Sequence, residues 1–280
     1  MSNFTNHPLY RKHTLDSVME QLWSFYKSHF AALFIISFII SLATTFFSLN
    51  IDTEKMMEMA TGDMAAMREM FSQMARLMIP VLLIALFGMV FLSYYVLKIP
   101  VHAADYLKLL SGTFKYLLTY LIIVILFIPL ASVAIVAGVL ALIIGVLFSV
   151  IWLAALSAFI LPLLMAEGND ITNAIIRSFR LLHRHFGSNI GWTAVIIVVM
   201  LIISLVVSGL AIIPFAGSFI QTMANPGEAT HLIEMAKNPI YIVFSSALNA
   251  LTLPVFPIFG FILYFNARAW EEDTLDSIDV

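Results

Sequence analysis

Long apolar runs, separated by shorter polar segments, make up most of this chain. A helix needs roughly 20 apolar residues to cross the ~30 Å hydrocarbon core of a bilayer. Six runs meet that length, and they cover about residues 30–49, 78–97, 116–137, 139–163, 190–213 and 240–265. The pattern predicts an all-α, polytopic membrane protein with six transmembrane helices, formed by a single integral membrane domain over residues 1–280.

The interval from Tyr116 to Met165 decides the number of spans, because its 50 residues include no charged side chain. A single helix of that length would measure ~75 Å, more than twice the thickness of the core. We therefore interpret the interval as a tight hairpin of two spans that turns near Ala137 and Gly138. One long broken helix is the alternative, and it would give five spans and a C-terminal tail outside the cell.

The composition agrees with membrane insertion and excludes some chemistry. Hydrophobic residues make up 61% of the chain and charged residues 11%, whereas soluble domains carry about 25% charged residues. The formal net charge of −3 is too small to indicate a charged partner, and no nucleic acid is expected. Because the chain has no cysteine, it has no disulfide, thiolate nucleophile or cysteine-based metal site.

Lysine and arginine are distributed unevenly between the two sides of the expected membrane. Four of the 14 lie on the side opposite the N-terminus: Lys55, Arg68, Arg76 and Lys237. The other ten lie on the N-terminal side: Arg11, Lys12, Lys27, Lys98, Lys108, Lys115, Arg177, Arg180, Arg184 and Arg268. Because cytoplasmic loops are rich in positive charge, we expect a multi-pass protein of the cell inner (plasma) membrane with both termini cytoplasmic.

A polar segment between the fourth and fifth runs predicts an amphipathic cytoplasmic helix over residues 170–186, with Asn169 or Asp170 as its N-cap. At 100° per residue its apolar side chains share one face. That face holds Ile171, Ile175, Phe179, Leu182 and Phe186. Arg177, Arg180 and Arg184 lie on the opposite face. Such a helix, tethered to spans at both ends, is expected to lie at the bilayer surface.

Two other segments resemble this helix. Residues 15–30 align with residues 171–186 without gaps, and both copies end in His-Phe before a span. Residues 105–116 form a third, poorer copy. We therefore expect three cytoplasmic interfacial helices, each preceding a span. On the other side of the membrane, a Met-rich helix is expected over residues 54–77.

The charged residues near the span ends have three possible roles. Arg177 or Arg180 can pair with Glu167, and Arg268 can pair with Glu271 or Glu272, which would lock the cytoplasmic ends of spans together. Alternatively, the arginines of residues 170–186 can contact anionic lipid, because a guanidinium matches phosphate oxygens. Binding of a substrate phosphate is the third possibility.

The Met-rich segment, extended by one residue to Met78, holds eight of the 15 methionines. Thioethers on a non-cytoplasmic face can ligate Cu(I), and they can equally form an adaptable apolar surface against the membrane or a membrane protein partner. We favour packing, because no cysteine or well-placed histidine reinforces a metal site. No cofactor and no metal is expected.

Inside the spans, ionisable residues are missing from the expected mid-membrane region. This argues against ion-coupled transport, which usually needs such groups. The strongest polar group at depth is Asn249 in the sixth run, ahead of Pro254 and Pro257. It indicates either an interhelical hydrogen bond beside a proline kink or a substrate cavity with freed carbonyls.

Two patches resemble a known family. The first comprises Pro162, Glu167, Ala174 and the run from Arg177 to Leu181. The second is the run from Leu263 to Arg268, followed by Glu271 or Glu272. Together they cover about a tenth of the chain and resemble the integral membrane domain of some bacterial glycerophosphoryl diester phosphodiesterases and its stand-alone relatives. Asn266 and Ala267 depart from the family pattern, which has an acid and an aliphatic residue there.

The resemblance implies a six-helix membrane domain, without a firm activity. The catalytic barrel of those enzymes needs roughly 250 residues of its own, and these 280 residues leave no room for it. We found no catalytic constellation, so we expect a non-enzymatic protein with an accessory, scaffolding or anionic-lipid-contacting role. An uncoupled transporter or lipid exporter with a groove beside the sixth span is the alternative. A membrane-embedded enzyme acting on lipid phosphodiesters is a weaker one.

Overall fold

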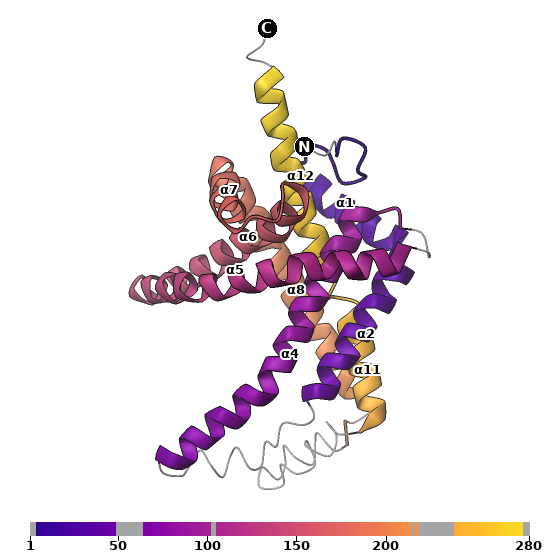
Figure 1. Ribbon diagram of the computed structural model, residues 1–280, viewed down its shortest axis with the longest axis vertical. Coiled ribbons are helices and arrows are strands. Elements are labelled where there is room, and N and C mark those ends of the chain that lie inside the picture. The colour runs from indigo at the N-terminus through magenta and orange to yellow at the C-terminus, as the bar shows by residue number, and fades with distance from the viewer. Residues whose placement is uncertain (1–3, 49–63, 102–104, 214–215, 218–237, 277–280) are drawn as a thin grey trace. The chain divides into compact units, whose positions relative to one another are not determined.

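The computed structural model describes residues 4–48, 64–101, 105–213, 216–217 and 238–276 (Figure 1). Helices dominate these residues, which contain no β-strand. Six helical segments are long and apolar enough to cross a membrane: Phe30–Ser48, Met74–Lys98, Tyr106–Leu140, Ile144–Ala166, Phe186–Ala211 and Pro239–Asp273. The predicted class, an all-α multi-pass membrane protein with six spans, is therefore confirmed.

The chain divides into two compact units. The first comprises Met1–Leu33, Met89–Leu201 and Pro254–Val280, and the second comprises Phe34–Gly88 and Ile202–Leu253. The helices of the first unit are α1 (Leu15–Ser28), the later part of α4 (Met64–Lys98), α5 (Tyr106–Leu140), α6 (Leu142–Ala166), α7 (Ile171–Arg184), the first part of α8 (Phe186–Ile212) and α12 (Val255–Asp276).

The core of the first unit lies where α12 packs on α6. Its largest fully buried side chains include Phe159, Phe259, Phe261, Tyr264 and Phe265. The two helices approach closely at Gly260, where an added Cβ would lie 2.6 Å from the carbonyl oxygen of Ala158. Because backbone cannot give way as a flexible side chain can, this contact requires glycine. The close packing fixes the first half of α12 against α6. The second half of α12 carries the charged residues Arg268, Glu271 and Glu272.

The α5–α6 hairpin turns at Ala141, later than the predicted turn at Ala137 and Gly138. The left-handed residue of the turn is Leu142, with a φ of 65°, although glycine usually occupies such positions. Gly138 lies inside α5. A Cβ at this position would be 2.7 Å from the carbonyl oxygen of Gly145 on α6, so the two helices approach closely here. The glycine that suggested the turn serves helix contact instead.

The third predicted interfacial helix is not separate from its span. α5 begins at Tyr106 and continues without interruption to Leu140, so the predicted segment over residues 105–116 forms the first turns of a long helix. The expectation of three separate interfacial helices is wrong for this segment. Buried side chains such as Leu109, Thr113 and Tyr116 attach these turns to the unit.

The N-terminal segment, residues 4–14, packs against α12, which Figure 1 shows beside it in yellow. The side chain of Leu9 is fully buried. The rings of Phe4, His7 and Tyr10 contact Phe265 at centroid distances of 5.7, 4.6 and 5.8 Å. This segment therefore forms part of the unit that contains α12.

In the second unit, α2 (Phe30–Ser48) lies against the early part of α4, because Gly88 leaves room for the side chain of Ile40. The hydroxyl of Ser246, on α11 (Pro239–Ala250), donates a hydrogen bond to Thr45 over 3.2 Å. The sixth span is not continuous as predicted. Residues 251–254 separate α11 from α12.

The Met-rich segment also differs from its prediction. Residues 54–63 lie outside the described part of the chain. From Met64 onward the segment belongs to α4, which continues through Pro80 to Lys98, so within the described residues it is not a separate helix. Among the methionines from Met64 to Met78, the side chains of Met74 and Met78 are described, and that of Met78 is exposed. The choice between packing and Cu(I) stays open.

Candidate functional site

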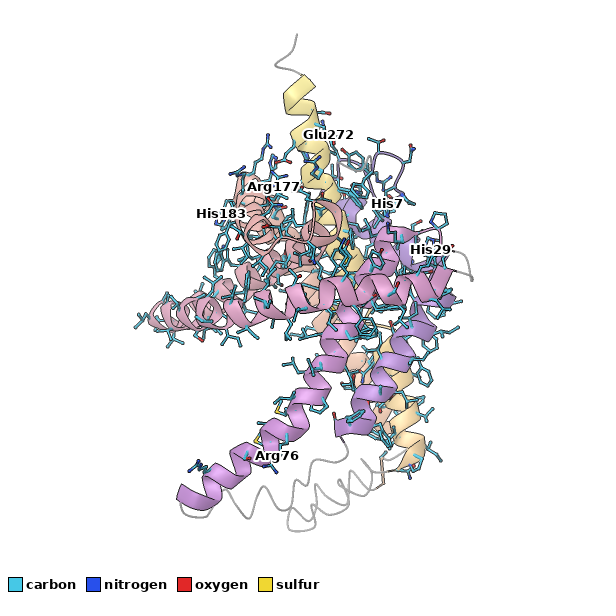
Figure 2. All side chains as sticks on the ribbon, in the orientation of Figure 1. His7, His29, Arg76, Arg177, His183 and Glu272 are labelled. Atoms are coloured by element: carbon cyan, nitrogen blue, oxygen red, sulfur yellow. The ribbon has the colours of Figure 1, made fainter. Side chains whose placement is uncertain are left out.

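The candidate site is an arginine–glutamate cluster formed by the end of α6, the middle and end of α7 and the last turns of α12. Its members are Glu167, Arg177, Arg184, Arg268, Glu271 and Glu272. Figure 2 labels Arg177 on α7 and Glu272 on α12. Three arginines face three glutamates, so the formal charges balance.

Arg177 is the centre of the cluster. Its Nε and Nη2 donate to the two carboxylate oxygens of Glu167 over 3.1 and 3.0 Å. Its Nη1 and Nη2 donate to the carboxylate oxygens of Glu271 over 3.1 and 2.9 Å. One guanidinium therefore holds two carboxylates in bidentate geometry, which is the strongest form of this interaction. The exposed fractions of the three side chains are 17%, 15% and 12%.

Two other arginines complete the cluster. Arg268 reaches Glu271 over 3.4 Å, Glu272 over 3.5 Å and Glu167 over 3.9 Å. Arg184 reaches Glu271 over 3.4 Å with 36% of its side chain exposed. Glu271 thus faces arginines on α7 and on its own helix. Because several charges share each partner, the cluster joins three helices rather than a single pair of side chains.

Local sequence places Arg177 in this position. Gly168 adopts a φ of 121° at the end of α6, a conformation that glycine adopts without strain. Asp170 then caps α7, because its carboxylate accepts a hydrogen bond from the amide of Asn173. The side chain of Asn169 donates to the carbonyl of Lys115 over 2.9 Å, which ties the turn to α5. α7 therefore starts at a fixed point beside α5 and α6.

The buried face of α7 is rotated from its predicted apolar face. The residues buried against the rest of the unit are Ala174, Ser178, Leu181 and Leu182. Of the predicted face, only Leu182 belongs to this buried set, while Ile171, Ile175 and Phe179 are half-buried. Small residues allow α7 to pack closely on α6, and the rotation brings Arg177 to the edge of the buried face.

Phe179 belongs to a row of rings along the boundary of α6 and α7. Its ring lies 5.8 Å from the ring of Trp152 and 6.1 Å from that of His183. His183 in turn stacks on Phe186 at 5.3 Å. The row therefore links α6 to α7 and to the first residue of α8.

Asparagine and tyrosine side chains extend the cluster. The amide of Asn189, on α8, donates to the carbonyls of Leu181 and Leu182 over 3.1 Å each and closes the C-terminal end of α7. The oxygen Oδ1 of buried Asn266 accepts from the amide of His13 over 2.8 Å. The hydroxyl of Tyr264 donates to Glu167 over 3.2 Å.

Sequence reasoning missed the roles of these polar side chains. A single asparagine inside an apolar run, directly after an amphipathic helix, was the only available indication of Asn189. Tyr264 and Asn266 stood in the second family-like patch without an assigned role. Their partners are distant in sequence, so spacing alone did not reveal them.

The N-terminal segment reaches the same helix end. The hydroxyl of Tyr10 donates to Glu272, and Lys12 pairs with Asp273. Lys12 also lies over the ring of Trp270, 4.4 Å from its centroid. Burial and the bond to Glu272 raise the pKa of Tyr10. The segment thus adds neutral and charged contacts to the outer side of the cluster.

The predicted ion-pair residues come together, and the pairing is more extensive than expected. Arg177 has Glu167 as predicted and Glu271 in addition. Arg268 has both glutamates that were considered for it. Arg180 does not join the cluster: it is exposed and makes no ion pair with the residues that the structure describes. Of the three candidate lipid-contacting arginines, Arg177 is therefore already occupied.

Asn249 lies far from this cluster in the chain, near the end of α11. Its side chain is exposed and makes no hydrogen bond with the described residues. Its carbonyl accepts from the amides of Thr252 and Leu253 over 3.0 and 3.2 Å. The interhelical hydrogen bond from Asn249 therefore stays a prediction, and the helix breaks after Ala250 where a proline kink was expected.

Electrostatics keep the central arginine of the cluster charged. Burial acts to lower the pKa of the Arg177 guanidinium, but the hydrogen bonds and charges of Glu167 and Glu271 outweigh it and hold this pKa above its ordinary value. Arg177 therefore stays charged, and the two carboxylates use four of its five N–H donors. What the arrangement can do is lock α7 and α12 to the end of α6.

The core beside the cluster leaves little room for a substrate. A cavity of about 10 Å³ lies among α4, α5, α6 and α12, with Ser93, Tyr120 and Ser157 in its wall. This volume holds one water molecule at most. Searches of protein-family models, curated proteins and solved structures found no significant match to this chain.

Proposed function

We propose that this protein is a non-enzymatic, multi-pass protein of the cell inner membrane that contacts anionic lipid and acts as an accessory or scaffold. In this proposal both termini are cytoplasmic and α7 lies at the inner surface of the bilayer. The observation that carries it is that two arginines of α7 have different surroundings. Arg177 is held by two glutamates, whereas Arg180 is exposed and outside that cluster.

Two features of α7 support a position at the membrane surface. Ile176 has 53% of its surface exposed close to exposed Arg180, so apolar and basic side chains share the open side. Exposed apolar surface together with arginine is typical of helices that lie in the headgroup region.

The geometry also supports kinship with the membrane domain of glycerophosphoryl diester phosphodiesterases. The two patches that resemble this family are about 90 residues apart in the chain, yet Arg177 of the first contacts Glu271 of the second over 2.9 Å. Tyr264 of the second contacts Glu167 of the first. We therefore propose that the family-like residues serve one purpose, the cluster, and that this chain is a stand-alone relative.

Lipid binding by purified protein tests the proposal. The full chain is reconstituted in nanodiscs that contain phosphatidylcholine with or without phosphatidylglycerol, and retained lipid is counted by native mass spectrometry. Arg180→Ala is expected to weaken phosphatidylglycerol retention about fivefold, as the loss of ~1 kcal/mol per basic residue implies. Arg11→Ala, which removes an equal exposed charge from the N-terminal segment, is the matched control. Equal retention by both variants would contradict the proposal.

A second candidate function rests on the broken sixth span. Residues 251–254 interrupt the helix between Ala250 and Val255, and transporters often place a substrate site at such a break. This observation favours an uncoupled transporter or lipid exporter. Proteoliposomes with fluorescently labelled lipid would distinguish the two functions, because only an exporter accelerates movement of the label between leaflets.

A further inference from the structure

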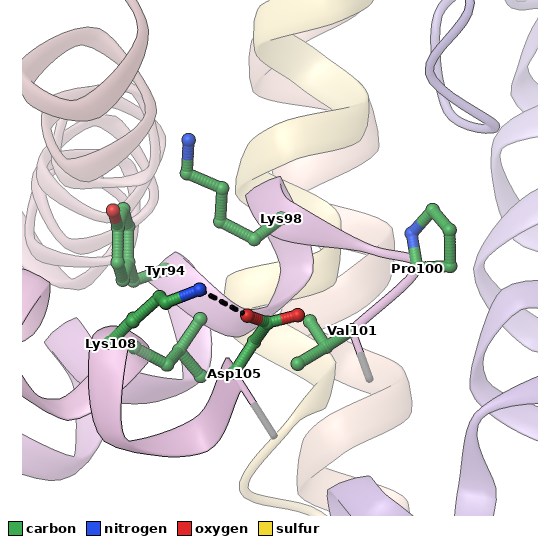
Figure 3. A pocket seen from close by; sticks show the side chains of 7 residues that line it. Tyr94, Lys98, Pro100, Val101, Asp105 and Lys108 are labelled. Atoms are coloured by element: carbon green, nitrogen blue, oxygen red, sulfur yellow. Dashed lines mark hydrogen bonds and ion pairs between the residues drawn. The ribbon is translucent and has the colours of Figure 1, made fainter. Parts of the chain in front are cut away.

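A second charged site lies between the end of α4 and the beginning of α5, away from the arginine–glutamate cluster. It is a pocket of about 310 Å³, near the lower limit for sites that hold small molecules. The residues that line it are Tyr94, Lys98, Pro100, Val101, Asp105, Lys108 and Leu109. Figure 3 shows their side chains arranged around the opening.

The lining carries more positive than negative charge. Lys108 pairs with Asp105 over 2.9 Å, whereas Lys98 has no carboxylate partner among the described residues and lies 5.7 Å from the ring centroid of Tyr94. Two ammonium groups against one carboxylate leave a single net positive charge. The Lys98 ammonium, which has no carboxylate partner among the described residues, lies near the Lys108–Asp105 ion pair. This arrangement suits the binding of one anionic group.

Packing holds the Tyr94 phenol at the pocket. A Cβ at position 112 would lie 2.4 Å from a carbon of the Tyr94 ring, so Gly112 allows the ring to lie directly on α5. Figure 3 shows the Tyr94 hydroxyl and the Lys98 ammonium pointing to the same side. The pocket therefore presents a neutral donor next to a charged one, above an apolar floor that includes buried Leu109.

The surroundings indicate where the anion comes from. Lys98 ends one candidate span and Tyr106 begins the next, and span ends lie at the depth of lipid headgroups. Apolar side chains on the following turns of α5 are exposed: Leu107 by 79%, Leu110 by 38% and Phe114 by 59%. A phosphate in the pocket would thus have a surface beside it that suits acyl chains.

We propose that this pocket binds the phosphate of an anionic phosphodiester, with Lys98 and Lys108 neutralising its charge and Tyr94 donating a hydrogen bond. Asp105 orients Lys108 and repels a second negative charge, so the site suits a phosphodiester better than a phosphomonoester. The position at the span ends assigns the ligand to the headgroup of an anionic phospholipid.

Single substitutions in the full chain test the site. Phosphatidylglycerol is titrated onto detergent-purified protein, and bound lipid is followed by native mass spectrometry. Lys98→Ala is expected to weaken binding about fivefold, and Asp105→Asn to strengthen it by a similar factor. Lys115→Ala is the matched control, because Lys115 is an exposed lysine on α5, the helix of Lys108, and lies 5.6 Å from the ring centroid of Tyr116 without lining the pocket.

Soluble probes identify the source of the anion. Dimethyl phosphate, a phosphodiester without acyl chains, and inorganic phosphate are titrated against the same variants. Lipid binding that depends on Lys98 and resists competition by both probes supports a lipid headgroup. Competition by dimethyl phosphate that disappears in Lys98→Ala supports a soluble phosphodiester at the same pocket. Equal lipid binding by Lys98→Ala and Lys115→Ala, or tighter competition by inorganic phosphate, would overturn the proposal.

This inference rests on the proposed function only in placing the pocket at a membrane surface. Its variants do not alter α7, and Arg180→Ala does not alter the pocket. Loss of lipid in Arg180→Ala alone or in Lys98→Ala alone therefore shows which of the two sites is correct.

Discussion

Arg177 and Glu271 are separated by 94 positions in the chain, and Nη2 of the arginine lies 2.9 Å from Oε2 of the glutamate. The pair joins α7 to the end of α12, and Glu167 on the other side of Arg177 adds the end of α6. An apolar chain with 11% charged residues thus gathers six of them at one place. Charges that are partly withdrawn from water need partners, and the cluster supplies them.

Removal of the central arginine is expected to destabilise the protein strongly. Arg177→Ala leaves Glu167 and Glu271 with fewer partners in a largely buried position, and such a loss costs about 3 kcal/mol. Arg180→Ala, on the same helix but exposed, should change the free energy of unfolding by less than about 0.5 kcal/mol. Thermal unfolding of the two variants in detergent measures the difference.

A triple variant separates charge from packing. Replacement of Arg177 together with Glu167→Gln and Glu271→Gln removes the unpaired charges and should recover part of the lost stability. A triple variant as unstable as Arg177→Ala would mean that the cost comes from lost packing of the arginine side chain.

The sequence was sufficient to propose the pairs Arg177–Glu167 and Arg268–Glu271, because charged residues are scarce near the span ends and had few alternative partners. It was not sufficient for the joint use of Arg177 by two glutamates. That arrangement depends on the rotation of α7, whose buried face follows small residues such as Ala174 and Ser178 rather than the large apolar ones. Side-chain size at a helix contact is set by the partner helix, which periodicity does not describe.

Acid is expected to loosen the N-terminal segment. Burial lowers the pKa of His7, and burial together with the charge of Arg11 lowers the pKa of His13. Because the folded state favours the neutral rings, protonation favours the released state, and stability that is complete above the ordinary value of 6.5 falls as the pH drops below it.

Cysteine accessibility measures this release. The chain has no cysteine of its own, so Leu9→Cys reports only on the buried position of Leu9. Its maleimide labelling rate, divided by that of exposed Arg11→Cys, should rise between pH 7 and about pH 5.5. Replacement of both histidines with glutamine should abolish this rise, and a ratio independent of pH in the histidine-containing protein would contradict the expectation.

The hairpin of α5 and α6 is expected to tolerate no side chain at Gly145. A Cβ there would lie 2.4 Å from the carbonyl oxygen of Gly138, so Gly145→Ala should cost roughly 2 kcal/mol through overpacking. Gly191→Ala is the control, because nothing lies within 4 Å of a Cβ at that helical position. That substitution should be neutral or stabilise the helix. Unfolding midpoints in detergent that move equally would contradict the close contact.

The orientation of the chain is testable with single cysteines as well. Arg76→Cys should react with a membrane-impermeant maleimide on intact cells, whereas Arg180→Cys should react only after the cells are permeabilised. The reverse pattern would place the termini outside and remove α7 from the inner leaflet.

Turns and breaks were harder to predict than spans. The α5–α6 turn uses Leu142 in a left-handed conformation, while the nearby glycines, Gly138 and Gly145, lie in the helix contact. Within the charge-free interval we used glycine to locate the turn, but the glycines there allow close contact between α5 and α6 instead. The break after Ala250 lies beside Pro254, so proline indicated a distortion correctly but not that the helix would end.

The attachment of residues 4–14 to α12 has a consequence for biosynthesis. Tyr10 and Glu272 are 262 positions apart, and His13 and Asn266 are 253 apart. While the intervening helices emerge from the ribosome and enter the bilayer, Leu9 and the rings around it have no α12 to bury them. Residues 4–14 are therefore covered only after α12 is translated, and a nascent protein halted before α12 would present that apolar segment to chaperones and proteases.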